Sequence, residues 1–151
     1  MTNDLPSVRL AVIEDLDALQ DVYRDASLSN EHDRPNLLAH PGLLNLDVTG
    51  VHEGRTIAAI DKGTVVGFAT FSHHPEHMEL EALFVDPAHW RRGHAMRLMD
   101  AVVDTARRTG VPRVEVTAND HASPFYDAAG FVQVGMVDTL FGPVPRKHLA
   151  I

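Results

Sequence analysis

The chain has 151 residues, with 13 basic and 21 acidic side chains, a net charge of −8 and no cysteine. This length suits one domain, predicted over residues 1–151. The lack of cysteine excludes disulfides, thiolate metal sites and cysteine nucleophiles, and the acidic charge argues against nucleic-acid or anionic-membrane partners. No basic segment followed by an apolar run opens the chain, so we expect a cytoplasmic protein.

The first half of the chain shows helical and strand periodicities separated by turn residues. The expected elements are a strand at residues 7–13, a helix at 14–28, a polar loop at 29–35, a short helix and turn at 36–46, and strands at 56–61 and 65–71. The last two strands form a hairpin with Gly63 in its turn.

Three histidines follow the hairpin, at His73, His74 and His77. Their spacing fits no structural zinc pattern, and Pro75 makes the segment a turn. We therefore predict no metal site.

The central unit is a strand at 80–85, a basic turn at 89–93 and a long amphipathic helix that ends at Gly110. The start of a helix offers unpaired amides and the positive end of a dipole, and Arg91 and Arg92 flank it here. This arrangement predicts an anion site, most naturally for phosphate.

Charge is unevenly distributed around this unit. Residues 91–113 contain six arginines against Asp100 and Asp104, a local charge of +4 that leaves −12 for the rest of the chain. The basic island favours a small polyanion as ligand, and leaves room for a cationic substrate elsewhere. Three of its arginines are expected to point into solvent: Arg97, Arg107 and Arg108.

The remaining residues predict strands at 113–118, 131–137 and 146–151, with a short helix within 119–130 that ends at Gly130. Gly142, Pro143 and Pro145 precede the last strand, and they predict a bend and an edge position.

Two motifs carry a family resemblance. The segment from Trp90 to Ala95 (WRRGHA) resembles the acyl-CoA signature of the GNAT superfamily of N-acetyltransferases, Gln/Arg-x-x-Gly-x-Gly/Ala, with Trp90 departing from the first position. The segment 119–131 resembles the second GNAT signature, N-x-x-A-x-x-F/L-Y-x-x-x-G-F, and Leu83-x-Val85-x-Pro87 is a third anchor.

The resemblance implies an α/β (α+β) fold, with a mixed, mostly antiparallel sheet, a splayed parallel pair at 80–85 and 113–118, and flanking helices. It also implies acetyl-CoA as cosubstrate, without a metal. Pantetheine amides would pair with the splayed strand, and the pyrophosphate would bind the amides of residues 92–96. The implied cofactor-binding residues are Leu83, Phe84, Val85, Arg91, Arg92, Gly93, His94, Ala95, Met96, Asn119 and Tyr126.

Tyr126 matches the family position that often protonates the leaving thiolate, although a structural tyrosine packed beside Phe125 and Phe131 is the alternative. Glu79 and Glu81 share a face of their strand and are the candidate bases; two acids at a solvated strand end are the competing interpretation. Asp120 and His121 are reserves.

The sequence thus predicts an acyl-CoA-dependent N-acyltransferase that works by direct transfer in a ternary complex. A non-catalytic acyl-CoA-binding or sensing module and an unrelated phosphate- or nucleotide-binding α/β protein are the alternatives. The acceptor, a small-molecule or peptide amine, is open, as is a homodimer. In a GNAT fold the first loops cover the acceptor, which makes four residues candidate contacts: Glu31, His32, Asp33 and Arg34.

Overall fold

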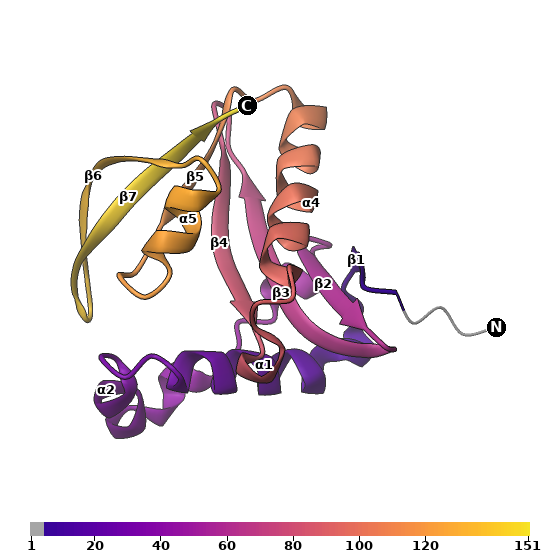
Figure 1. Ribbon diagram of the computed structural model, residues 1–151, viewed down its shortest axis with the longest axis vertical. Helices are drawn as coiled ribbons and strands as arrows, with labels where there is room; N and C mark the ends of the chain where they lie inside the picture. The colour runs from indigo at the N-terminus through magenta and orange to yellow at the C-terminus, as the bar shows by residue number, and fades with distance from the viewer. Residues whose placement is uncertain (1–4) are drawn as a thin grey trace. The chain divides into compact units, whose positions relative to one another are not determined.

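The computed structural model describes residues 5–151. Its strands are β1 (Ser7–Leu10), β2 (Thr56–Asp61), β3 (Thr64–His73), β4 (Met78–Val85), β5 (Arg113–Thr117), β6 (Val132–Thr139) and β7 (Gly142–Ala150). Its α-helices are α1 (Leu16–Leu28), α2 (Arg34–Ala39), α3 (Thr49–His52), α4 (His94–Thr109) and α5 (Ser123–Ala128), labelled in part in Figure 1. None of the helices in residues 5–151 has the length and apolar character to cross a membrane.

The strands form a seven-stranded sheet in the order β1-β2-β3-β4-β5-β7-β6. Four neighbouring pairs are antiparallel: β1–β2, β2–β3, β5–β7 and β6–β7. The β4–β5 pair is parallel, and its ladder runs only from Met78↔Val114 to Leu80↔Val116. This confirms the predicted mixed, mostly antiparallel sheet with one parallel pair and flanking helices.

The chain divides into two compact units, each built from two segments. The first comprises Met1–Thr70 with Ala82–Ala101, and the second comprises Phe71–Glu81 with Val102–Ile151. Because β3, β4 and α4 contribute residues to both, the division follows no break between elements. One domain over 1–151 stays a prediction, and residues 1–4 lie outside the described part.

The core of the first unit forms where the apolar face of α1 packs against the sheet. Leu19 and Val22 of α1 are buried together with Phe68 of β3, which is 1% exposed. Tyr23 packs edge-on against Phe84 of β4, with ring centroids 5.1 Å apart. These contacts fix the end of β4, from which the turn toward α4 departs.

The second unit is organised around β5, which pairs with β4 on one side and β7 on the other. Its Val114 and Val116 are buried. Helix α5 lies beside the β6–β7 hairpin (Figure 1), where the buried amine of Lys147 on β7 pairs with the carboxylate of Asp127 on α5. These contacts hold α5, and with it Tyr126, on the sheet.

The predicted last strand needs a correction. It begins at Gly142 instead of Arg146, and β7 lies between β5 and β6, so β6 is the edge strand. Pro143 and Pro145 are tolerated because the β5 ladder reaches only Arg146, and Pro145, which lacks an N–H, uses its carbonyl oxygen to accept from the amide of Ala118 at 2.9 Å.

Other boundaries also differ from the sequence prediction. Helix α2 begins at Arg34, inside the expected loop, α3 was not expected, and β1 ends at Leu10. Strands β3 and β4 are longer than predicted, whereas β2 has its predicted limits.

Candidate active site

The turn between β4 and α4 reverses the chain with two residues in the left-handed backbone region. Arg91 has a φ of 64° and Gly93 a φ of 83°. Glycine adopts this region without steric cost, whereas it costs other residues about 1–2 kcal/mol. The turn is tied to β4, because Trp90 Nε1 donates to the carbonyl oxygen of Val85 at 2.8 Å. The chain therefore leaves β4 and enters α4 in a fixed direction.

Five consecutive amides at this turn, from Arg92 to Met96, have no acceptor among residues 5–151. The first hydrogen bond at the start of α4 runs from the amide of Arg97 to the carbonyl oxygen of Gly93, at 3.1 Å. Unpaired amides and the helix dipole give this end a partial positive charge. A phosphate oxygen can accept from several of these amides at once.

The arginine side chains of the turn differ in their partners. Arg91 and Arg92 are exposed, and Arg92 Nη1 lies 3.3 Å from Nδ1 of His89. Arg97, expected to point into solvent, does not. Both of its terminal nitrogens donate to the carbonyl oxygen of Arg92 at 3.1 Å, and Nη1 also contacts Nδ1 of His94 at 3.1 Å. The prediction was wrong because side chains in the first helical turn lean toward the helix N-terminus.

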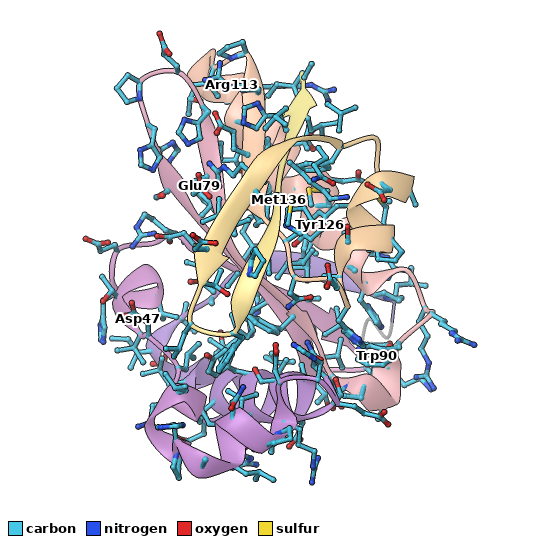
Figure 2. The ribbon with its side chains drawn as sticks, turned by 90° about the vertical axis from the view of Figure 1, so that its left-hand side faces the viewer. Asp47, Glu79, Trp90, Arg113, Tyr126 and Met136 are labelled. Carbon is cyan, nitrogen blue, oxygen red and sulfur yellow. The ribbon has the colours of Figure 1, made fainter. Side chains whose placement is uncertain are left out.

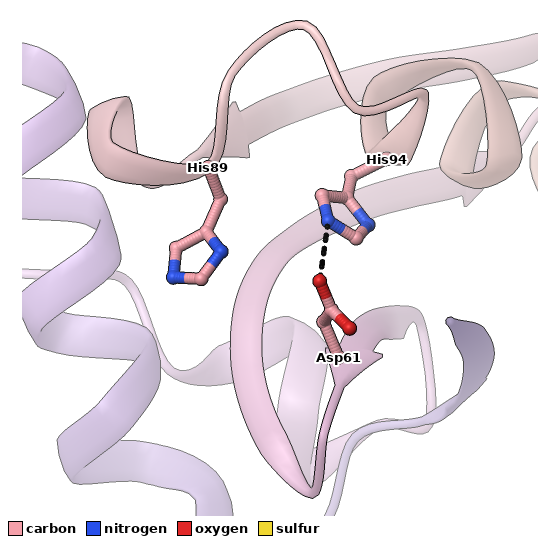
Figure 3. A group of neighbouring side chains, drawn as sticks. All are labelled: Asp61, His89 and His94. Atoms are coloured by element: carbon pink, nitrogen blue, oxygen red, sulfur yellow. Dashed lines mark ion pairs between the residues drawn. The ribbon is translucent and has the colours of Figure 1, made fainter. Parts of the chain in front are cut away.

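Asp61, His89 and His94 gather below this turn (Figure 3), with one potential ligand atom of each within 4.8 Å of the others. His94 is 2% exposed, and its Nε2 lies 3.4 Å from Asp61 Oδ2. Burial and the charge of Arg97 lower the pKa of His94 below its ordinary 6.5, while Asp61 opposes the shift. The ring is therefore neutral at pH 7.

These three side chains fit a metal ion poorly. Nδ1 of His89 faces an arginine N–H, and so does Nδ1 of His94. A guanidinium can only donate, so each Nδ1 uses its lone pair and the ring proton sits on the other nitrogen. The two guanidinium charges would also repel a cation. The group is better described as a neutral histidine held between Arg97 and Asp61.

Tyr126 lies on α5, beside the β6–β7 hairpin (Figure 2). It is 4% exposed and packs between the rings of Phe125 and Phe131, each with its centroid 5.3 Å away. Burial raises its pKa well above the ordinary 10. Asn119 precedes the helix and fixes its start, since Oδ1 accepts from the amide of Ala122 at 2.8 Å.

The two candidate bases have different surroundings. Glu79 is bound at both oxygens by Arg146, each at 2.6 Å, and His77 Nε2 lies 3.0 Å from Oε1 (Glu79 is labelled in Figure 2). Glu81, two residues along β4, is exposed. The guanidinium of Arg146 thus occupies both carboxylate oxygens of Glu79. His77, Glu79 and Glu115 also form a potential metal group, yet Arg146 occupies it as the cation.

Residues 16–131 match the model of the Acetyltransferase (GNAT) family. The chain belongs to the GNAT acetyltransferase family. N-alpha-acetyltransferase RimI of Mycobacterium tuberculosis is 36% identical over 101 residues, which is 64% of this chain and 63% of that protein. The match thus spans less than two thirds of this relative's length.

Solved structures of GNAT proteins share the fold. The PaiA N-acetyltransferase of Thermoplasma acidophilum, in complex with coenzyme A, has a TM-score of 0.74 at 16% identity, covering 97% of this chain and 99% of that one. YncA of Salmonella typhimurium, with acetyl-CoA, has a TM-score of 0.71 at 22% identity, covering 98% and 94%. At these identities the likeness concerns the fold alone.

Within this GNAT chain, the predicted site residues fall in both compact units. Arg91–Met96 and Leu83–Val85 belong to the first, as one continuous stretch of turn and one of strand, while Glu79, Glu81, Asn119 and Tyr126 belong to the second. Residues 31–34 belong to the first unit, where Asp33 and Arg34 bind Asn30 and the carbonyl oxygen of Leu28.

Three residues around these sites were missed by the sequence analysis. Arg146 binds both Glu79 and Glu115, and Asp61 contacts His94. Glu115 alternates with Val114 and Val116 in RVEVT, so the sequence placed it on the polar face of the strand beside Arg113, and that neighbour was the available signal for a paired charge. Asp61 gave no such signal, because it stands at a hairpin turn, where aspartate is ordinary.

Proposed function

We propose that this GNAT chain transfers an acetyl group from acetyl-CoA to a primary amine, by direct transfer in a ternary complex. The row of unpaired amides from Arg92 to Met96 at the start of α4 carries the proposal. It supplies the donors that a pyrophosphate needs, and the exposed side chains of Arg91 and Arg92 add two positive charges.

The pantetheine arm is proposed to lie along the end of β4, at Leu83, Phe84 and Val85. The parallel ladder with β5 has already ended at Leu80, so an extended arm with amides can complete backbone pairing there. Trp90, where the motif has Gln or Arg, already donates to the carbonyl oxygen of Val85. We therefore expect Leu83 and Phe84 to provide the main backbone contacts.

In the reaction, the amine lone pair attacks the thioester carbonyl carbon, the C–N bond forms and the C–S bond breaks. One proton leaves the amine and one reaches the departing thiolate. We assign the second proton to Tyr126. Its raised pKa keeps the phenol protonated before the reaction but also makes it a weaker acid than the departing thiol, so the transfer is uphill and is proposed to occur as negative charge develops on sulfur.

Glu81 is the proposed base, because it is exposed to solvent and resembles a position where many family members carry the base. Glu81 would accept the amine proton through an intervening water molecule. Asn119 is proposed at the thioester end, since the turn before α5 uses its Oδ1 and leaves its NH₂ to donate to the ligand.

The acceptor to test first is the α-amino group of a peptide, because the relative from Mycobacterium tuberculosis is named as an N-alpha-acetyltransferase. Exposed Glu31 and His32 are the proposed contacts for its charged or polar part. A cytoplasmic location and a homodimer stay predictions.

The test is a thiol-release assay with acetyl-CoA against a panel of peptides, polyamines and amino acids. Turnover of any amine supports the proposal. CoA binding without turnover of the panel would instead favour the non-catalytic acyl-CoA-binding module, and stronger binding of nucleotides without a pantetheine arm would favour an unrelated phosphate site.

A further inference from the structure

We propose that Asp61, His94 and Arg97 form a positioning chain that orients the phosphate-binding turn of this protein. The inference rests on the proposed acetyl-CoA site and concerns side chains that need not touch the ligand. Its three members come from β2, the first position of α4 and the first turn of α4, all within the first compact unit.

The guanidinium of Arg97 donates to one carbonyl oxygen through both of its terminal nitrogens. Its Nη1 and Nη2 both lie 3.1 Å from the carbonyl oxygen of Arg92. The guanidinium also lies against Gly93, where a Cβ atom would stand 3.5–3.7 Å from its terminal atoms. The side chain thus covers one side of the Arg92–Gly93 peptide.

These two hydrogen bonds also determine the direction of the N–H of Gly93, which shares a peptide group with the carbonyl of Arg92. The described peptide bonds are not cis, and in a trans peptide the C=O and N–H bonds point in opposite directions. Since the carbonyl of Arg92 faces Arg97, the amide of Gly93 faces away from it. The guanidinium therefore fixes the orientation of the Arg92–Gly93 peptide and leaves the amide of Gly93, one of the unpaired amides, on the opposite side.

His94 holds Arg97 in that place. Its Nδ1 lies 3.1 Å from Arg97 Nη1, and because arginine only donates, Nδ1 is the acceptor. The ring proton then sits on Nε2, a buried atom without a hydrogen-bond partner among residues 5–151, which lies 3.4 Å from the negatively charged Asp61 Oδ2. Asp61 thus favours the tautomer that accepts from Arg97 (Figure 3).

A substitution of Arg97 can separate the role of its guanidinium geometry from the role of its positive charge. Arg97→Lys keeps the positive charge but loses the fork that binds the carbonyl of Arg92 and His94 Nδ1 together. We expect CoA affinity to fall about tenfold, the usual loss for one charged hydrogen bond. Binding of neutral pantetheine should not change. Arg108→Lys, in the exposed last turn of α4, is the matched control.

A second pair of variants tests His94. His94→Asn places an amide oxygen close to the position of Nδ1 and can still accept from Arg97, whereas His94→Gln places its polar atoms near Nε2 and cannot. CoA affinity should fall less in His94→Asn than in His94→Gln. A purely structural role for this buried ring predicts the reverse, since asparagine leaves the larger cavity.

Calorimetric titrations measure the affinity of these variants for CoA and for pantetheine. Nitrogen-15 NMR of the wild-type protein shows directly which ring nitrogen of His94 carries the proton. The proposal expects the proton on Nε2, and a proton on Nδ1 would overturn it even if every variant failed to fold. Equal CoA affinity of Arg97→Lys and wild type would overturn it too. Wild-type protein that does not bind CoA at all would refute the proposed function instead.

Discussion

Replacing Glu115 by glutamine removes the charge at the centre of the network in the second unit. Glu115 is 7% exposed, accepts from Arg113 at 2.7 Å and Arg146 at 2.8 Å, and lies 2.9 Å from His148 Nε2. Burial alone would raise its pKa, but the arginine hydrogen bonds and nearby imidazoles lower it from 4.5 to about 2. A carboxylate with a depressed pKa stabilises the fold above its unfolded pKa.

The magnitude follows from that difference. At about 1.4 kcal/mol per pH unit, the step from 4.5 to about 2 corresponds to about 3 kcal/mol of the free energy of unfolding. This contribution is fully present above pH 5 and is lost as the pH falls from 4.5 toward 2. Glu115→Gln should therefore be less stable than wild type at pH 7, by up to about 3 kcal/mol, and the gap should close in acid.

Urea unfolding followed by circular dichroism at pH 7, 5, 4 and 3 measures the free energy of unfolding of both proteins. The contributions of the other acidic groups are the same in both and cancel in the difference. Glu76→Gln is the control, because Glu76 is exposed and lies 4.0 Å from Arg113. It should change stability by less than about 0.5 kcal/mol. A gap for Glu115→Gln that stays constant from pH 7 to pH 3 would refute the reasoning, since the loss would then come from packing instead of ionisation.

Three further predictions concern the ligand and the reaction. Arg92→Glu should weaken CoA binding in calorimetry while the fold persists, since it puts a carboxylate beside the pyrophosphate; unchanged affinity would contradict the placement, and Arg108→Glu is the control. Raising the salt concentration should weaken CoA binding but hardly affect pantetheine, because exposed charges are screened beyond about 10 Å at 0.1 M; a flat salt response would leave the amides alone as the source of affinity. Tyr126→Phe should lower the single-turnover rate by about 10²–10⁴-fold with acetyl-CoA affinity nearly unchanged, and a wild-type rate in the folded variant would remove Tyr126 from the mechanism.

Local sequence determined most of the element order. Periodicity located α1 and α4, and the hairpin with Gly63 gave β2 its limits, because these signals depend on residues close together in the chain. The position of β7 was not available in this way. The prolines of β7 lack a backbone N–H, which local sequence shows. The two neighbours of a strand, however, depend on pairing with residues that are distant in the chain.

The basic turn that leads into α4 could also be predicted from sequence, because a helix start with a glycine and two arginines is a local arrangement; its binding of phosphate stays a proposal. Its unpaired amides follow from where α4 begins. The motif residues for the reaction, Asn119 and Tyr126, came from the family resemblance, and their roles stay proposals.

Only the tertiary structure decided which charged groups meet. Glu79 and Arg146 are 67 positions apart, yet Arg146 binds both carboxylate oxygens of Glu79. The sequence placed Arg97 in solvent, whereas the fold turns it onto the carbonyl of Arg92 and brings Asp61 of the hairpin beneath His94. Local periodicity specifies helices, strands and the ends of helices, while burial and the partner of each charge depend on residues that only folding brings together.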